Sequence, residues 1–134
     1  MPEGMRVAAG DYHGIVINRS QRDRGIFREL DVIGTKRLFL GLIVFYKIRV
    51  RPQDIDSVIK LVQENMSSRF LIKKQQYYAH FYRADELIVV FRDKTFRATT
   101  DKKTWRDAIA YGKWLHIVED QLDFVPNRVE DETF

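Results

Sequence analysis

The chain contains no cysteine, which excludes disulfides, a thiol nucleophile, an iron–sulfur cluster and cysteine-based zinc sites. Its three histidines, His13, His80 and His116, are far apart, and none stands in a metal-ligand spacing such as H-E-x-x-H. The seven glycines never form a phosphate-binding pattern such as G-x-G-x-x-G. We therefore predict no metal, no cofactor and no assigned catalytic residue.

Long apolar segments are also absent. The longest run, Leu38 to Tyr46, is far shorter than the roughly 18 residues that would indicate a membrane span. The first residues include Glu3, Gly10 and Asp11, where a signal peptide would need its apolar region. We expect a cytoplasmic protein with no membrane partner.

The composition is typical of a single globular domain. The chain has 134 residues, of which 45% are hydrophobic and 31% are charged, which is sufficient for a core and argues against general disorder. Its net charge of +4 is unevenly distributed along the chain. From residue 119 onward there are six acidic residues and only one basic residue, Arg128, so the rest of the chain is strongly basic. A basic body with an acidic tail can meet RNA or another polyanion, although a solvated basic surface gives the same pattern.

The order of the expected elements indicates an α+β fold, a ferredoxin-like split βαβ sandwich (βαββαβ) with an N-terminal extension. We expect an extension over residues 1–37, a ferredoxin-like domain over 38–126 and an acidic tail over 127–134. The extension should begin irregularly or as a hairpin, with a helical turn near Ile26 to Val32. The domain should contain strands at 38–51, 71–83, 86–99 and 121–125, and helices at 52–66 and 101–118.

Both faces of the predicted sheet carry large side chains. In the strand 38–51, every even position is apolar, while the odd positions change from apolar to basic, and Gly41 suggests a bulge. Helices on one side would leave an apolar outer face of the sheet in water. We expect that face to be covered by the N-terminal segment, by a second subunit or by a bound molecule. Its residues would be Phe39, Ile43, Phe45, Ile88 and Val90.

Two groups of residues are candidates for binding. Aromatic and imidazole side chains on the outer face could line a ligand site: Phe45, Tyr78, His80 and Tyr82. Basic side chains could bind phosphate or carboxylate groups: Arg19, Arg22, Arg24, Lys47, Arg49 and Arg51. The structural alternatives are a sheet histidine with satisfied hydrogen bonds and an ordinary basic surface.

Three functions fit this pattern. The first is a non-enzymatic binding or regulatory module that acts as a homodimer, which would bury the outer face. The second is RNA binding across the open sheet, although Glu86 to Phe91 does not match the RNP1 pattern. The third is a small dimeric enzyme without a cofactor, in which His80 would transfer protons.

Overall fold

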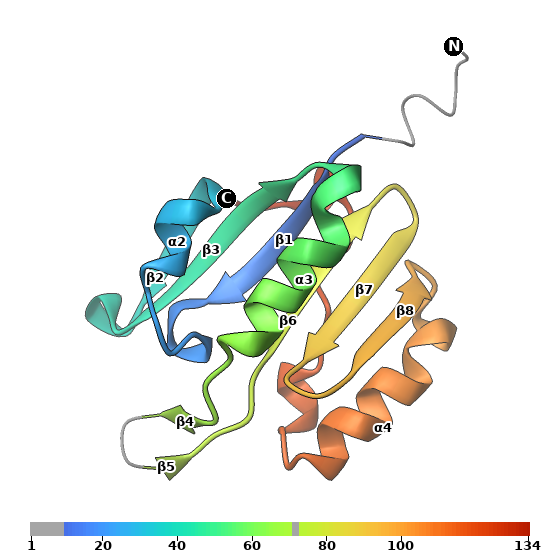
Figure 1. Ribbon diagram of the computed structural model, residues 1–134. Coiled ribbons are helices and arrows are strands. Elements are labelled where there is room, and N and C mark those ends of the chain that lie inside the picture. The colour runs from blue at the N-terminus through green and yellow to red at the C-terminus, as the bar shows by residue number, and fades with distance from the viewer. Residues whose placement is uncertain (1–9, 71–72) are drawn as a thin grey trace.

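The computed structural model describes residues 10–70 and 73–134, and within them the protein has an α+β fold (Figure 1). A six-stranded antiparallel sheet has the order β2-β3-β1-β6-β7-β8, and β4 pairs with β5 in a separate two-stranded sheet. The strands of the large sheet are β1 Tyr12–Ile17, β2 Asp31–Leu38, β3 Ile43–Val50, β6 Tyr78–Arg83, β7 Glu86–Phe91 and β8 Thr95–Thr99. The remaining elements are β4 Arg69–Phe70, β5 Lys73–Lys74, α2 Ile26–Glu29, α3 Ile55–Glu64 and α4 Arg106–Trp114.

The predicted α+β class is confirmed, but the four-stranded βαββαβ topology is not, because the described chain forms a six-stranded sheet. The helical turn expected near residue 26 is present as α2. None of the helices in the described ranges is both long and apolar enough to span a membrane.

Strand β1 lies in the middle of the sheet, although the sequence suggested only an irregular or hairpin-like start there. It pairs antiparallel with β3 on one side and with β6 on the other. Therefore β3 and β6 run parallel, and α3 connects them in a crossover that is split by β1. Gly14 permits this packing, because a Cβ at that position would lie 2.4 Å from the Phe81 ring.

Helix α3 covers one face of the sheet, as its apolar stripe predicted. Pro52 opens a short 3-10 turn at its start, and Ile55, Ile59 and Val62 face the sheet. Their core includes Ile88 and Val90, which are almost fully buried. These two residues were expected on the uncovered face, and that expectation is wrong because they lie under α3. Strand β7 is apolar on both sides, so the alternation of its residues did not show which side faces α3.

Helix α4 packs on the opposite face. Asp101 caps the 3-10 turn Lys102–Trp105 that precedes it, accepting a 3.0 Å hydrogen bond from the Lys103 backbone N–H, as predicted. Trp105 and Ala108 form a second core with the other side of β7. The sheet therefore has a helix on each face, whereas a ferredoxin-like sandwich has both helices on one face.

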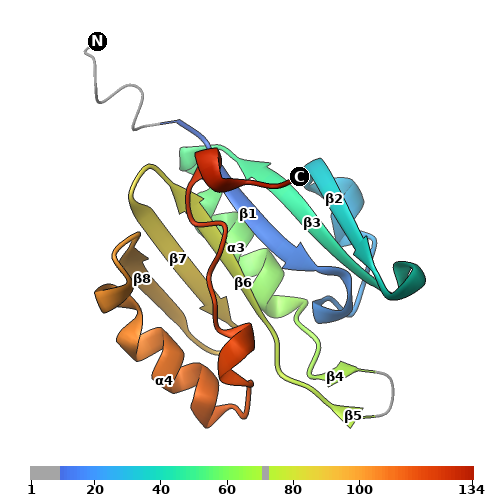
Figure 2. The same cartoon turned by 180° about the vertical axis from the view of Figure 1, so that it is seen from behind.

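The predicted strand at residues 121–125 does not form. Glu119–Gln121 is a 3-10 turn, and the chain then continues without strand pairing. Leu122 and Phe124 are buried in the α4 core. Figure 2 shows that this C-terminal segment crosses the sheet on the face opposite α3, passing over β6 toward β3. We call residues 121–134 the C-terminal strap.

The predicted strand 38–51 is in fact the end of one strand, a turn and a second strand. β2 precedes β3, and the turn between them, Phe39–Gly41, is made almost entirely of apolar residues. Apolar alternation continues through this turn, so only Gly41 marked it, and it was interpreted as a bulge. The expected bend near Asp93 is likewise a full turn that separates β7 from β8.

Candidate functional site

The three candidate ligand residues on β6 lie side by side beneath the C-terminal strap. The Tyr78 hydroxyl donates to the carbonyl of Gln121, and the His80 Nε2 atom lies 2.8 Å from the carbonyl of Pro126. The Tyr82 hydroxyl donates to Glu132 Oε2 over 2.5 Å. The expected cover is confirmed for this β6 row, where it is the protein's own C-terminal strap rather than any of the three expected partners. It is not confirmed for the other residues named for that face, because Phe39 is 75% exposed and Ile43 and Phe45 are half-buried.

Glu132 anchors the strap in a polar cluster. Its carboxylate also lies 2.5 Å from His13 Nδ1 and 3.2 Å from Lys47 Nζ. Burial alone would raise the pKa of Glu132, but hydrogen bonds from Tyr82, His13 and Lys47 hold that pKa below its ordinary value. Burial and the neighbouring carboxylate raise the pKa of Tyr82, so its hydroxyl remains a donor. This arrangement binds a carboxylate, and the strap supplies that carboxylate.

His80 is buried and neutral at neutral pH. Burial lowers its pKa to about 4, although the hydrogen bond to Pro126 and the charge of Asp123 oppose this shift. A neutral imidazole whose Nε2–H donates to a backbone carbonyl, with only 4% of the residue exposed, cannot reach an external substrate while the strap is in place. The geometry favours the structural interpretation of His80.

Phe45 is not brought into the β6 row. It pairs with Ile17 on β1 and with Lys36 on β2, whereas His80 pairs with Ile15. It is half-buried, on the part of the sheet that leads to the β2–β3 turn. The strap ends at Phe134, which contacts Lys47 two positions further along β3.

The candidate anion-binding residues on and after β3 do not form one surface. Lys47 is buried and bonds to Glu132 and to the carbonyl of Phe134. Arg49 pairs with Asp31 over 2.9 Å, and Arg51 pairs with Asp54 over the same distance. These three cations are engaged within the fold.

Of the candidate arginines before α2, Arg19 contacts the chain next to the β2–β3 turn, and Arg24 shares a neighbour with it. The Arg19 Nε atom donates to the carbonyl of Leu42 over 3.2 Å. The charges of Arg19 and Arg24 act on Tyr77, whose pKa is raised by burial against their opposing effect. Arg22 is directed elsewhere, because its guanidinium donates to the carbonyl of Glu64 over 2.5 Å.

The β2–β3 turn is apolar and exposed. We call Leu38, Phe39, Leu40 and Leu42 the apolar tip; their exposed fractions are 37%, 75%, 108% and 38%. Phe39 and Leu40 have φ angles of 52° and 57°, in the left-handed region that bulky side chains normally avoid. Two unfavourable features, exposure to water and a disfavoured backbone, therefore coincide on the same two residues.

The apolar tip is preceded by two cations and held by hydrogen bonds at its base. Lys36 and Arg37 immediately precede it on β2, and both are exposed. Asn18 accepts a 3.1 Å hydrogen bond from the Val44 backbone N–H and donates a 3.2 Å bond to the carbonyl of Leu42. The turn that carries Asn18 also contacts β4, which bears Arg69. The tip is thus presented on a fixed support beside a positively charged surface.

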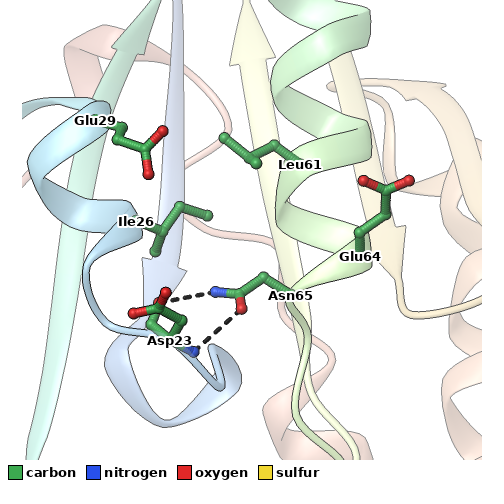
Figure 3. Close-up of a pocket in the computed structure, with 6 residues that line it drawn as sticks. All are labelled: Asp23, Ile26, Glu29, Leu61, Glu64 and Asn65. Carbon is green, nitrogen blue, oxygen red and sulfur yellow. Dashed lines mark hydrogen bonds between the residues drawn. The ribbon is translucent and has the colours of Figure 1, made fainter.

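A shallow depression lies between α2 and α3 (Figure 3). It encloses about 240 Å³ and is lined by Asp23, Ile26, Glu29, Leu61, Glu64 and Asn65. Asn65 closes its floor through hydrogen bonds with the backbone N–H and carbonyl of Asp23. Figure 3 shows Glu29 and Glu64 on opposite sides, and among the described residues no three His, Asp or Glu side chains are placed to hold a metal ion.

Sequence reasoning missed Glu132, His13 and Leu40. His13 falls in the segment that was expected to begin irregularly or as a hairpin, but it lies on β1 and its Nδ1 contacts Glu132 of the strap. The acidic run at residues 130–132 was a usable signal, because a basic and aromatic sheet face attracts carboxylates. Comparison of the chain with protein-family models, with curated proteins and with solved structures finds no match to any of them.

Proposed function

We propose that the protein is a non-enzymatic binding module that contacts its partner through the apolar tip and the cations around it. The observation that carries this proposal is the conformation of Phe39 and Leu40. Phe39, Leu40 and Gly41 have consecutive positive φ angles of 52°, 57° and 87°, and turn positions of this kind strongly favour glycine, asparagine and aspartate. Bulky apolar residues there oppose local folding preference, and such conflicts concentrate at functional positions.

The alternative of an enzyme has less support from the geometry. The imidazole of His80 is buried under the strap, and the carboxylates of the depression in Figure 3 do not converge. General acid–base chemistry needs a titrating group within hydrogen-bond reach of the substrate.

RNA binding across the sheet would require the strap to move. Base stacking needs exposed aromatic faces. Tyr78, His80 and Tyr82 instead bond to residues of the strap. Any RNA contact is therefore more compatible with the cationic end than with the sheet face.

Homodimerisation through the apolar tip is the second candidate, because Phe39 is exposed and Ile43 and Phe45 are only half-buried. Against it, a two-fold axis near the tip would bring Lys36 and Arg37 of both copies together, and like charges repel. We also propose that the split β3-α3-β6 crossover is a distant variant of the ferredoxin-like arrangement, and that the protein is cytoplasmic.

The test replaces the tip with the residues that such a turn prefers, in the double variant Phe39→Asn, Leu40→Gly. We expect the free energy of unfolding to rise by about 1 kcal/mol, since a left-handed residue costs roughly 1–2 kcal/mol and the unfolded entropy of glycine returns part of this. Urea denaturation measures the change. The matched control is Val118→Asn, because Val118 is 61% exposed with an ordinary φ of −62°.

If the double variant is instead destabilised by more than about 1 kcal/mol, the tip serves folding and the proposal fails. Light scattering on the same samples addresses self-association. If the parent has the mass of a dimer and the double variant has the mass of one chain, the partner of the tip is a second copy of this protein and not another molecule.

A further inference from the structure

We propose that the partner of the apolar tip is the surface of an anionic lipid bilayer, with Phe39 and Leu40 entering the boundary between headgroups and acyl chains. This inference rests on the proposed function and names the partner class. It also revises the expectation of no membrane partner, since peripheral attachment requires no membrane-spanning helix.

The shape of the tip fits a bilayer. Its apolar side chains are exposed at a turn between two strands, and none of them lines the depression of Figure 3. Within the turn, the Leu42 backbone N–H donates to the carbonyl of Phe39 over 3.1 Å, and Asn18 fixes the chain on both sides of Ile43. A bilayer adapts to a projecting group, and a preorganised tip loses little conformational entropy when it inserts.

The charge around the tip fits anionic headgroups. Exposed cations lie on β2 before the tip, in the loop before α2 and on the β4–β5 hairpin: Lys36, Arg37, Arg24, Arg69 and Lys74. In the described part of the chain, no carboxylate lies within ion-pair distance of any of these five. Basic residues beside an apolar anchor are the combination that recognises anionic lipid surfaces.

The aliphatic side chains favour lipid over nucleic acid. Leu38, Leu40 and Leu42 have no flat face on which a base can stack, so RNA would leave them in water. Insertion into a bilayer removes their apolar surface from water, and each buried side chain contributes favourably. The cations alone would suit either an anionic bilayer or RNA, and the aliphatic side chains of the tip favour the bilayer.

The experiment is co-sedimentation of the full chain with vesicles of equimolar phosphatidylcholine and phosphatidylglycerol, and with vesicles of phosphatidylcholine alone. We expect binding to the anionic vesicles that weakens as salt is raised. The variant Phe39→Asn, Leu40→Gly should bind at least about tenfold more weakly. Lys36→Gln, Arg37→Gln should bind about thirtyfold more weakly, while Val118→Asn should bind as the parent does.

Circular dichroism confirms that each variant is folded. Three results would overturn the inference: no binding to the anionic vesicles, equal binding to phosphatidylcholine alone, or equal binding by the tip variant. Binding of a single-stranded RNA oligonucleotide that depends on Lys36 and Arg37 but not on the tip, without vesicle binding, would assign the cations to nucleic acid. The two proposals can fail separately. If the tip variant is more stable than the parent but binds vesicles equally well, the lipid proposal is refuted and the proposal of a binding module stands.

Discussion

Burial of His80 should make the protein less stable as the pH falls from neutral toward 5. The pKa of this imidazole is about 4 in the folded protein, against an ordinary value of 6.5. The unfolded chain therefore takes up a proton more readily than the folded chain, so acidification favours unfolding. The stabilisation is complete above pH 6.5 and is lost as the pH falls from 6.5 toward 4.

The two pKa values set the size of this effect. Near pH 5 the unfolded histidine is almost fully protonated while the folded one is mostly neutral, which gives a loss of about 2 kcal/mol relative to pH 7.5. This is a large fraction of the stability of an ordinary domain. The lower limit near pH 5 also keeps the measurement above the range in which most carboxylates titrate.

Urea unfolding near pH 7.5 and near pH 5 measures the loss, with fluorescence of the buried Trp105 as the signal. The variant His80→Gln keeps an N–H donor for the Pro126 carbonyl but has no titration in this range. Its free energy of unfolding should therefore change much less between the two conditions. An equal decrease in parent and variant would show that another group is responsible, and a parent without pH dependence would show that His80 is not buried as described.

Two further substitutions test the strap and the central strand. Glu132→Gln leaves the buried Lys47 without its carboxylate partner and should lower the free energy of unfolding by about 2 kcal/mol near neutral pH. Because the pKa of Glu132 is depressed, the difference should shrink as the pH falls through and below 4.5, and Glu130→Gln, at an exposed acid of the same segment, is the control. Urea denaturation over that pH range measures both variants. Equal free energies of unfolding for the two variants would show that Glu132 makes no special contribution through its contacts with Lys47, His13 and Tyr82. Gly14→Ala should cost about 1–3 kcal/mol, since its Cβ would lie 2.4 Å from the Phe81 ring. A thermal midpoint unchanged from the parent would show that β1 and β6 can separate without cost.

The parts of the fold that the sequence predicted well are those in which periodicity and boundary residues agree. Helix α3 combines an initial Pro52 with an apolar stripe, and α4 follows a capping Asp101. The two sides of β6 were also identified correctly, because Tyr78, His80 and Tyr82 are too large to be left uncovered. In each of these cases, local preference and tertiary packing favour the same structure.

The parts that were missed are those in which local preference is overridden. The β2–β3 turn uses Phe39 and Leu40 where turn residues would be expected, so its sequence resembles a strand. The strap has an alternating start at Gln121 but pairs with no strand, and its position depends on Glu132, far along the chain. Sequence alone could not identify contacts that join residues so distant.

The central position of β1 also determines the order in which the chain can fold. β1 is completed first during synthesis, but its neighbours β3 and β6 come later, and Ile15 pairs with both Lys47 and His80. The middle of the sheet therefore cannot close until the chain has been made through Arg83. Contacts between residues this distant slow folding to the range of milliseconds to seconds. Until then, the β1 edge that later pairs with β6 stays open, and an open apolar edge can pair with other chains.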